Sequence, residues 1–534
     1  MKSVMQHQFS RVPSVEIPRS SFDRSCGYKT TFNNGDLIPF FLDEALPGDT
    51  FNCRVTALAR VATLLSPVMD NMYLDTFFFA VPYRLVWNNW KKFHGEQDDP
   101  GDSISFVPPT LTTTAVTGEA VGTIFDYMGI PTEIPDLEFN SFHLRAYNLI
   151  YNEWFRDENL QDSVTVHKDD GATEALTDYS LLKRGKRRDY FTSCLPWPQK
   201  GDSVSLPLGT TAPVTGIGKL DQTYGQSPAN VYETGGTAST SYAAGATYFG
   251  DNIATPNQVV YLEEDPNNAG YPGIYADLAS ATAATINQIR QAFQVQRLLE
   301  RDARGGTRYV ELIASHFGIK NAGGDARLQR PEYLGGGSTP LNVSEVTSTN
   351  KHTLAALGDL GAKGSAFIRN HGFTKSFTEH CLIVGLISAR ADLTYQQGLN
   401  RMWSRQTRYD YFYPSLSHLG EQAVLNKEIY AQGTSDDELV FGYNERYAEY
   451  RYKPSLITGE FRSAYTATLD SWHLSQEFGS LPTLGDTFIK EDVPMDRVKA
   501  AGSTVPDFIF DSYINLKCAR PMPLYGVPGL LDHF

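Results

Sequence analysis

The sequence predicts a mainly β fold, an antiparallel sandwich of the Greek-key or jelly-roll type with long insertions between its strands. Residues 51–61 and 508–518 alternate between apolar and polar side chains, the pattern of a strand with one buried face. The two segments stand near opposite ends of the chain. Both must pair within one sheet system, since a lone strand would leave an open edge. Strand partners so far apart in sequence are typical of Greek-key and jelly-roll folds.

Three further segments have strand character. Residues 71–82 are rich in aromatic side chains and follow a turn-like stretch. Residues 381–387 form a continuous apolar run, as expected for a strand that is buried on both faces. Residues 461–469 alternate between apolar and polar side chains, and we expect a strand there as well.

A few helices are expected between the strands. Residues 83–94 and 143–157 carry aromatic side chains at helical spacing. The strongest helical pattern covers residues 283–304, where an apolar stripe ends at Gly305 and Gly306.

The chain divides into an N-terminal arm and one large domain. Residues 1–28 are polar and contain Pro13 and Pro18, so we expect an extended arm that needs a neighbouring surface to become ordered. Residues 29–534 form a single domain with long insertions. Residues 201–282 are rich in small residues and hold eight acidic residues against one basic residue, which predicts a surface-exposed insertion.

Composition limits the functional classes. The chain has 534 residues and a formal net charge of -15, so it is a poor candidate for the main condenser of a nucleic acid, and a genome would need a separate basic partner. Its five cysteines are scattered, which argues against a disulfide framework and a cysteine zinc site. The first residues lack the apolar segment of a signal peptide, and no apolar run approaches the ~20 residues that span a bilayer. We therefore expect a protein that stays in the cytosol of the cell that makes it.

No enzyme signature is present. The GxSxG, HExxH and P-loop motifs are absent, and Gly218-Lys219 is followed by leucine where a P-loop needs serine or threonine. We therefore expect no catalytic residues, no metal and no cofactor. A sandwich glycosidase with two carboxylates distant in sequence is a remaining alternative. Asp98, Asp99 and Asp102 suit either a calcium loop or, as we favour, a plain surface turn.

Two basic clusters are candidate contact sites. The densest run is a solvated loop or a patch that faces a genome. It consists of Lys183, Arg184, Lys186, Arg187 and Arg188. The second cluster is a set of arginines spaced 7, 4 and 3 residues apart, which places them on one face of a helix. We favour salt bridges to a neighbouring subunit for this face; the alternatives are a contact with nucleic acid and a merely solvated face. The second cluster consists of Arg290, Arg297, Arg301 and Arg304.

Tyrosine and arginine are concentrated in residues 409–414 and 443–454. These residue types are enriched in interface hot spots, although each can also pack on the chain's own core. The candidate inter-subunit contacts are Tyr409, Tyr411, Tyr443, Arg446, Tyr450 and Arg451.

Several long blocks of the sequence resemble the major capsid proteins of the gokushovirus branch of Microviridae, the small icosahedral single-stranded DNA bacteriophages. The blocks appear in the family's order along the whole chain, and the main departure is residues 201–282. They are residues 191–201, 291–318, 327–335, 392–409, 447–459 and 519–534.

The resemblance implies an eight-stranded jelly roll with large inserted loops, assembled as sixty copies into a T=1 shell around single-stranded DNA. It places the protein in the virion, after assembly in the host bacterial cytoplasm. It also implies four kinds of partner: an internal scaffolding protein, a DNA pilot protein, a small basic DNA-binding protein and a host surface receptor. Residues 201–282 match the insertion that forms threefold protrusions in related phages. A non-viral jelly-roll module that binds carbohydrate or a cell surface is the alternative function.

Overall fold

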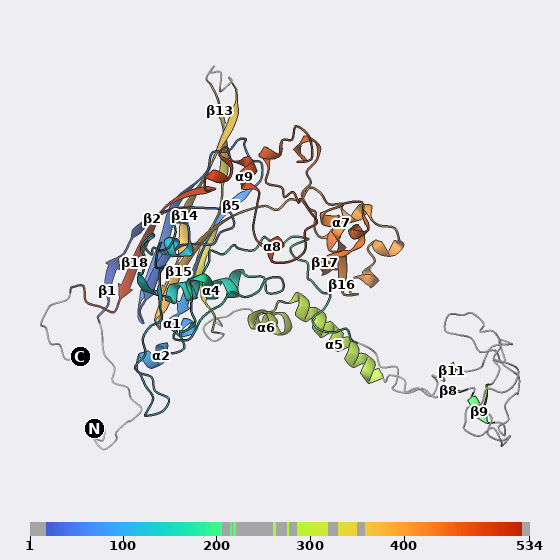
Figure 1. Cartoon of the computed structure of the whole chain (residues 1–534), viewed down its shortest axis with the longest axis horizontal. Coiled ribbons are helices and arrows are strands. Elements are labelled where there is room, and N and C mark those ends of the chain that lie inside the picture. The colour runs from blue at the N-terminus through green and yellow to red at the C-terminus, as the bar shows by residue number, and fades with distance from the viewer. Residues whose placement is uncertain are drawn as a thin grey trace, which may run out of the picture. The chain divides into compact units, whose positions relative to one another are not determined.

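Eight long antiparallel strands dominate the fold (Figure 1). The computed structural model describes residues 18–204, 286–318, 329–349 and 358–525, together with the backbone of short strand segments between residues 214 and 276. In chain order, the long strands are β2 (Cys26–Phe32), β3 (Ile38–Ala45), β4 (Thr50–Val61), β5 (Met72–Pro82), β12 (Glu332–Pro340), β14 (Leu360–Ser376), β15 (Cys381–Ala391) and β18 (Phe508–Arg520).

The strands form two sheets whose order defines the topology. One sheet has the order β2-β18-β4-β14, extended by β1 (Ser20–Asp23) beside β18 and by β13 (Asn342–Thr347) beside β14. The other has the order β3-β15-β5-β12. Successive long strands thus alternate between the sheets, except for β5 and β12, which are neighbours in one sheet. The last strand, β18, lies between the first, β2, and the third, β4. This is the strand order of a jelly roll, so the predicted fold class is confirmed.

The core lies between the two sheets and is rich in phenylalanine. The alternation of β4 and β18 places every second side chain in this core. The Phe32 and Phe508 rings stack with centroids 5.2 Å apart. The Phe40 ring contacts Phe78 at 5.6 Å and Phe510 at 6.0 Å, which joins the two sheets.

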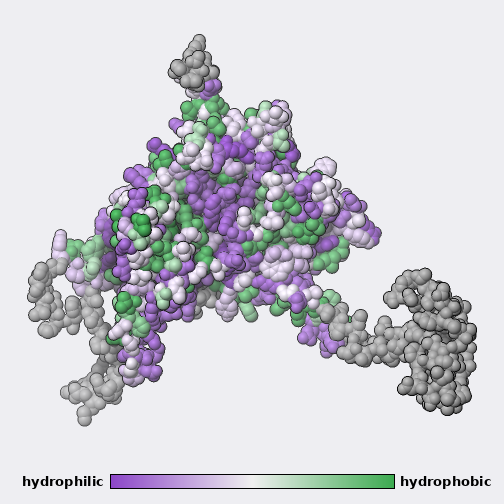
Figure 2. Space-filling model, in the orientation of Figure 1, coloured by the Kyte–Doolittle hydropathy of each residue, from purple (hydrophilic) through white to green (hydrophobic). Residues whose placement is uncertain are grey.

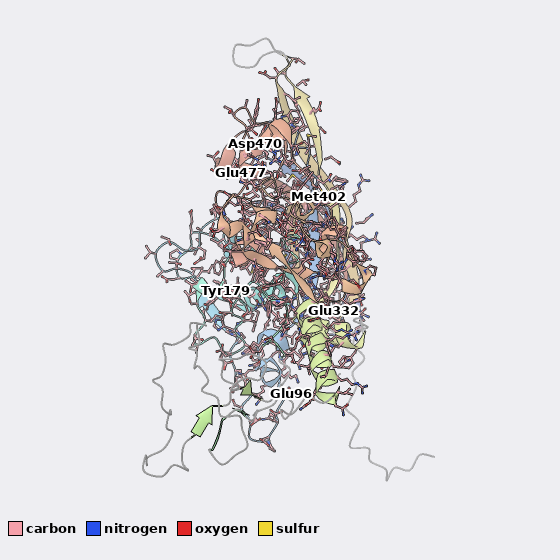
Figure 3. The ribbon with its side chains drawn as sticks, turned by 90° about the vertical axis from the view of Figure 1, so that its right-hand side faces the viewer. Glu96, Tyr179, Glu332, Met402, Asp470 and Glu477 are labelled. Atoms are coloured by element: carbon pink, nitrogen blue, oxygen red, sulfur yellow. The ribbon has the colours of Figure 1, made fainter. Side chains whose placement is uncertain are left out.

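A helical layer covers the outer face of the four-stranded sheet (Figure 1). Its helices are α1 (Tyr83–Val86), α2 (Trp90–Phe93), α3 (Ile124–Tyr127) and α4 (Phe142–Ile150), and α4 continues into a π-helical turn, Tyr151–Phe155. Leu382 and Val384 of β15 pack against this layer while Ile383 and Ile387 face the sandwich core. The continuous apolar run of β15 is therefore buried on both faces, as predicted. Tyr179, labelled in Figure 3, also belongs to this layer.

A smaller lobe has its own core. It contains β16 (Glu421–Leu425), α7 (Asn426–Ile429), β17 (Val440–Glu445) and α8 (Asp486–Ile489). The core consists of Tyr190, Phe191, Cys194, Val424, Ile429, Phe441, Ala448 and Phe488.

The prediction of a strand at residues 461–469 is wrong. The segment lies between the short 3-10 helices Gly459–Phe461 and Asp470–Trp472, and its backbone bonds are local. The N–H of Tyr465 donates to the carbonyl of Arg462 at 3.0 Å, and that of Leu469 donates to Glu460 at 2.9 Å. Tyr465 is exposed, so the apolar alternation here does not mark a buried face.

The remaining elements are short, apart from two helices. α5 spans Ile286–Arg304 and ends at Gly305 as predicted, and residues 83–94 form two short helices instead of one. The other elements are β6 (Thr110–Thr112), β7 (Glu138–Asn140), β8 (Val214–Thr215), β9 (Ile217–Lys219), β10 (Val260–Leu262), β11 (Tyr275–Ala276), α6 (Tyr309–Phe317), α9 (Met495–Val498) and the 3-10 turns Leu176–Asp178, Arg401–Trp403, Arg408–Asp410, Pro414–Leu416, Ser435–Glu438, Ala448–Tyr450 and Gly502–Thr504.

Contacts divide the chain into two units: residues 199–300, and the remainder. Most of residues 201–282 lie outside the described residues, as do residues 1–17 of the expected arm. The rest of that arm contains β1 and the start of β2, which both pair with β18. Among the described residues, no helix has both the length and the apolar composition required to cross a bilayer.

Candidate subunit and nucleic-acid interfaces

The basic run at residues 183–188 is engaged within the chain. Arg184 contacts Asp75 of β5 at 2.7 Å, and the same carboxylate is shared with Arg390. Lys186 is buried, donates to Gln476 at 2.9 Å and lies 4.4 Å from the centroid of the Phe488 ring. Burial lowers the pKa of Lys186 to about 8.

The other members of the run also have acidic partners. Lys183 contacts Asp492, Arg187 contacts Asp392 and Arg188 contacts Asp157, each at 2.8 Å. Backbone bonds fix the run as well, because the N–H of Lys186 donates to Ile489 and that of Glu491 donates to Arg184. The run therefore ties several distant segments together. This favours a structural role, while its contact with a genome stays a prediction.

The arginine face of α5 is only partly engaged. Arg304 forms an ion pair with Glu421 of β16, which anchors the end of the helix on the lobe. Arg290, Arg297 and Arg301 are exposed. The predicted face is therefore open along most of its length and consistent with an external partner.

A cavity of about 660 Å³ brings two of the predicted sets together. Arg184, Lys186 and Arg188 of the basic run line it beside Arg304 and Tyr452. Acidic side chains balance these cations, since Asp157, Glu158, Glu311 and Glu445 line the same cavity. We therefore assign this cavity to the intrachain ionic network.

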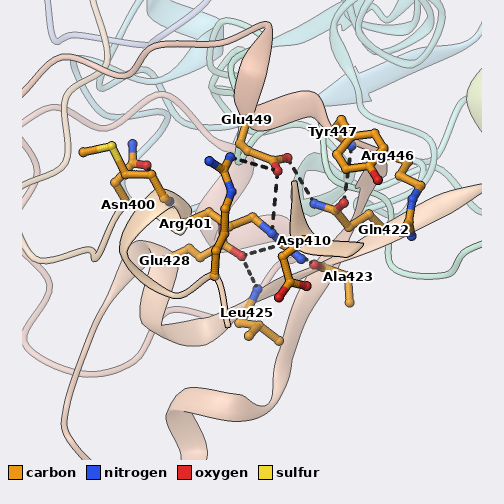
Figure 4. A network of polar contacts seen from close by, with 12 residues as sticks. Asn400, Arg401, Asp410, Gln422, Ala423, Leu425, Glu428, Arg446, Tyr447 and Glu449 are labelled. Carbon is orange, nitrogen blue, oxygen red and sulfur yellow. Dashed lines mark hydrogen bonds and ion pairs between the residues drawn. The ribbon is translucent and has the colours of Figure 1, made fainter. Parts of the chain in front are cut away.

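A buried polar network supports the tyrosine-rich part of the lobe (Figure 4). Arg401 donates from Nη1 to Glu428 at 2.9 Å and to the carbonyl of Ala423 at 2.7 Å. Gln422 donates to Glu449 at 3.1 Å, and Arg401 Nε lies 3.9 Å from Glu449. The Glu428 carboxylate also accepts from Tyr190 at 2.8 Å. Burial raises the pKa of Glu428, although Arg401 opposes that shift.

Exposed aromatic side chains occur on the segments that carry this network. Trp403 is 72% exposed, and the neighbouring Met402, labelled in Figure 3, is also exposed. Arg405 holds two of the rings, because its guanidinium carbon lies 4.3 Å from the Tyr450 centroid and 5.4 Å from that of Tyr411. We name the set of exposed rings on these segments the aromatic patch. It consists of Trp403, Tyr409, Tyr411, Phe412, Tyr413 and Tyr450.

The structure separates the six predicted tyrosine and arginine contacts. Tyr409, Tyr411 and Tyr450 belong to the aromatic patch. Arg451 pairs with Glu445, Arg446 lies over the Tyr447 ring, and the backbone of Tyr443 pairs with Leu195. Sequence reasoning missed Phe412, which lies within residues 409–414 but is neither a tyrosine nor an arginine, and Trp403, which precedes that segment. Both are among the exposed aromatic residues.

The acidic turn at residues 98–102 is closed by its own side chains. The Asp102 carboxylate accepts from the N–H of Asp98 at 3.2 Å and from that of Asp99 at 3.3 Å. Lys92 lies 3.4 Å from Asp98 and 3.6 Å from Asp102. Within the described part of the chain, no group of three or more acidic, histidine or cysteine residues is arranged to hold a metal ion.

Apolar surface is distributed over several places. Figure 2 shows apolar residues in separate clusters among hydrophilic ones on the face that it presents. A two-sheet sandwich that carries surplus aromatic and cationic side chains on its surface is suited to a structural subunit that contacts many neighbours.

Comparison with known proteins identifies the family. The chain belongs to the family described as Capsid protein (F protein), whose model matches residues 10–530. It is 48% identical to the capsid protein VP1 of Bdellovibrio phage phiMH2K, over 99% of this chain and 98% of that protein. It is 44% identical to the capsid protein VP1 of Chlamydia phage 1, with coverages of 99% and 98%, and 36% identical to that of Spiroplasma virus 4, with coverages of 98% and 97%. The protein is therefore a phage capsid protein of the virion, with a structural and not an enzymatic role, and the resemblance to Microviridae is confirmed.

Proposed function

We propose that sixty copies of this chain close into a T=1 icosahedral shell around a single-stranded DNA genome. The aromatic patch is the observation that carries this proposal. It presents large aromatic rings to solvent on a lobe with a buried polar network, and Arg405 holds two of these rings. Such residues contribute most of the energy at protein interfaces. A closed symmetric shell repeats each contact, so modest single interfaces add up to a stable particle.

The proposed partners follow from the resemblance and the charge. An internal scaffolding protein, a DNA pilot protein and a small basic DNA-binding protein accompany the shell. The net charge of -15 supports the last of these, because an acidic subunit needs a separate source of cations to compact a packaged genome.

Residues 201–282 are proposed to form the threefold protrusions and to contribute to attachment at the host surface receptor. Their acidic composition distinguishes them from the rest of the chain. The separation of residues 199–300 as a unit supports an insertion that is built independently of the sandwich.

The test is negative-stain electron microscopy with sedimentation of the expressed chain, alone and with its scaffolding protein. Uniform small spherical particles with a mass of about sixty subunits are the expected result. The Trp403→Ala variant tests the aromatic patch, and its particle yield should fall, whereas the control variant Tyr465→Ala, which removes an exposed ring outside the patch, should assemble like the wild type. A stable monomer under every condition would contradict the proposal, and binding to an oligosaccharide array would then favour the carbohydrate-binding alternative.

A further inference from the structure

The two sheets of the sandwich differ in how their outer faces are covered. The helical layer covers the four-stranded sheet. On the other sheet, the outward side chains of β2, β4, β14 and β18 are mainly exposed. We name this surface the open sheet face.

The open sheet face is basic, although the chain as a whole is acidic. The register places Lys517 opposite Asn52, Ile509 opposite Arg60, and Phe367 opposite Leu58, so one face collects side chains from several strands. Among the described residues, the acidic side chain on it is Asp511 of β18, and Asp23 of the neighbouring strand β1 stands opposite Lys517 at its edge. Its six basic residues are Lys29, Arg54, Arg60, Lys363, Arg369 and Lys517.

Most of these cations have no acidic partner among the residues that the structure describes. Lys29 contacts Asp511 at 2.9 Å, and Lys517 stands opposite Asp23 of β1 in the register. Within the part of the chain that the structure describes, no ion pair or side-chain hydrogen bond involves Arg54, Arg60 or Lys363. This contrasts with the run at residues 183–188, where each cation has a partner. The basic side chains that remain available to bind an anionic ligand therefore lie on the open sheet face.

Exposed apolar rings lie between the cations. Tyr513 is 54% exposed and stands between Thr56 of β4 and Gly27 of β2 in the register. Phe367 is 48% exposed, and the Arg369 guanidinium lies 4.6 Å from its centroid. Aromatic rings on a flat sheet provide stacking surfaces for unpaired bases, while cations around them contact the phosphates.

We propose that the open sheet face binds single-stranded nucleic acid. This inference rests on the proposed function, because the ligand inside a particle would be the packaged genome. A flat sheet does not enter the grooves of a duplex, and the bases of a duplex are not free to stack on Tyr513 or Phe367. Arg54 and Arg60 are six residues apart on one strand, which is about 20 Å. The face therefore holds on the order of four nucleotides per subunit.

Fluorescence anisotropy with a labelled 20-nucleotide oligo(dT) tests the proposal on the full chain. The test variant is Arg54→Gln/Arg60→Gln/Lys363→Gln. The control is Lys91→Gln/Lys168→Gln/Lys490→Gln, which removes equal charge away from this face. We expect the test variant to lose at least about tenfold in affinity and about two units of the slope of log affinity against log salt, because each contact with a single strand contributes about 0.7. The control should bind like the wild type.

The contribution of the aromatic rings to binding is tested with a separate variant. Tyr513→Ala/Phe367→Ala should weaken oligo(dT) binding by about tenfold with an unchanged salt slope. The wild type should bind a 20-base-pair duplex more weakly than oligo(dT). Equal loss of affinity in the test and control triple variants would overturn the proposal, since net charge alone would then explain binding.

Particle formation separates this inference from the proposed shell. Both triple variants should form particles like those of the wild type by electron microscopy. If the test variant binds oligo(dT) normally but forms no particles, the face is a subunit interface and the inference is wrong. If the wild type forms no particles, the shell proposal fails, whereas the oligo(dT) comparison still decides the role of this face.

Discussion

Arg401 donates a hydrogen bond to Glu428 across 2.9 Å, and only 3% of the Glu428 side chain is exposed. The carboxylate also accepts from the backbone N–H of Leu425 at 3.0 Å and from the Tyr190 hydroxyl at 2.8 Å. A buried carboxylate is tolerated only when such partners replace its water. This pair therefore sets the local stability of the lobe that carries the aromatic patch.

Removing the cation of this pair should destabilise the subunit. We expect Arg401→Met to lower the free energy of unfolding at pH 7 by about 3 kcal/mol, because it leaves the Glu428 charge buried without its cation. This loss in the free energy of unfolding should be smaller at pH 5, because the Glu428 carboxylate then takes up a proton more readily and no longer buries an unpaired charge. Urea unfolding of the unassembled subunit measures both values.

The control for this pair is a lysine–glutamate contact whose acidic partner is largely exposed. Lys427 lies 2.6 Å from Glu438, and 68% of the Glu438 side chain is exposed. Lys427→Met should cost less than about 1 kcal/mol. Equal losses for Arg401→Met and Lys427→Met would refute a special role for the buried pair.

The aromatic patch should affect assembly much more than folding. Trp403→Ala and Tyr411→Ala remove exposed rings, so we expect the free energy of unfolding to change by less than about 0.5 kcal/mol. If the patch is a subunit interface, each change weakens association by about 2 kcal/mol per contact and particle yield falls sharply. Sedimentation of the assembly mixture measures the yield. Tyr465→Ala removes a similarly exposed ring outside the patch and should assemble normally.

The register of β18 provides a sharp test of the sandwich. Phe508 is fully buried against Phe32, whereas the next residue, Ile509, points to the open sheet face and is 54% exposed. We expect Phe508→Ala to cost about 3–5 kcal/mol in the free energy of unfolding and Ile509→Ala less than about 1 kcal/mol. Urea denaturation compares the two variants. A reversed order would mean that the strand is shifted by one residue.

The sequence was most informative where a strand has one buried face. The alternation in β4 and β18 reflects a real boundary between the core and solvent, so both strands were predicted with bounds close to those observed. The same pattern failed at residues 461–469, because loop side chains there alternate by chance while the backbone bonds locally. Alternation of apolar and polar residues therefore indicates a buried face only where the segment packs against a core.

The candidate sites were harder to predict because charge depends on partners distant in sequence. Lys183 and Arg184 look like free cations in the sequence, yet Asp492 and Asp75 pair with them in the fold. Conversely, Arg54 and Arg60 stand singly in their segment. They join a basic surface only when β14 and β18 pair beside β4.

Lys186 should give the subunit a distinctive pH dependence. Its pKa is lowered to about 8 by burial in the fold and is about 10.5 in the unfolded chain. Between these values the unfolded chain holds a proton that the folded chain has released, so this group makes stability rise with pH there. The cost of the buried charge is fully present below pH 8 and is relieved towards pH 10.5.

Two variants of Lys186 isolate this effect from other titrating groups. Lys186→Met has no charge to bury, so its stability relative to the wild type should decline by up to about 3 kcal/mol between pH 7 and pH 10.5. Lys186→Arg stays protonated, so its deficit relative to the wild type should grow over the same range. Urea unfolding at several pH values measures both differences. If both differences stay constant with pH, the Lys186 ammonium is not desolvated in the folded subunit.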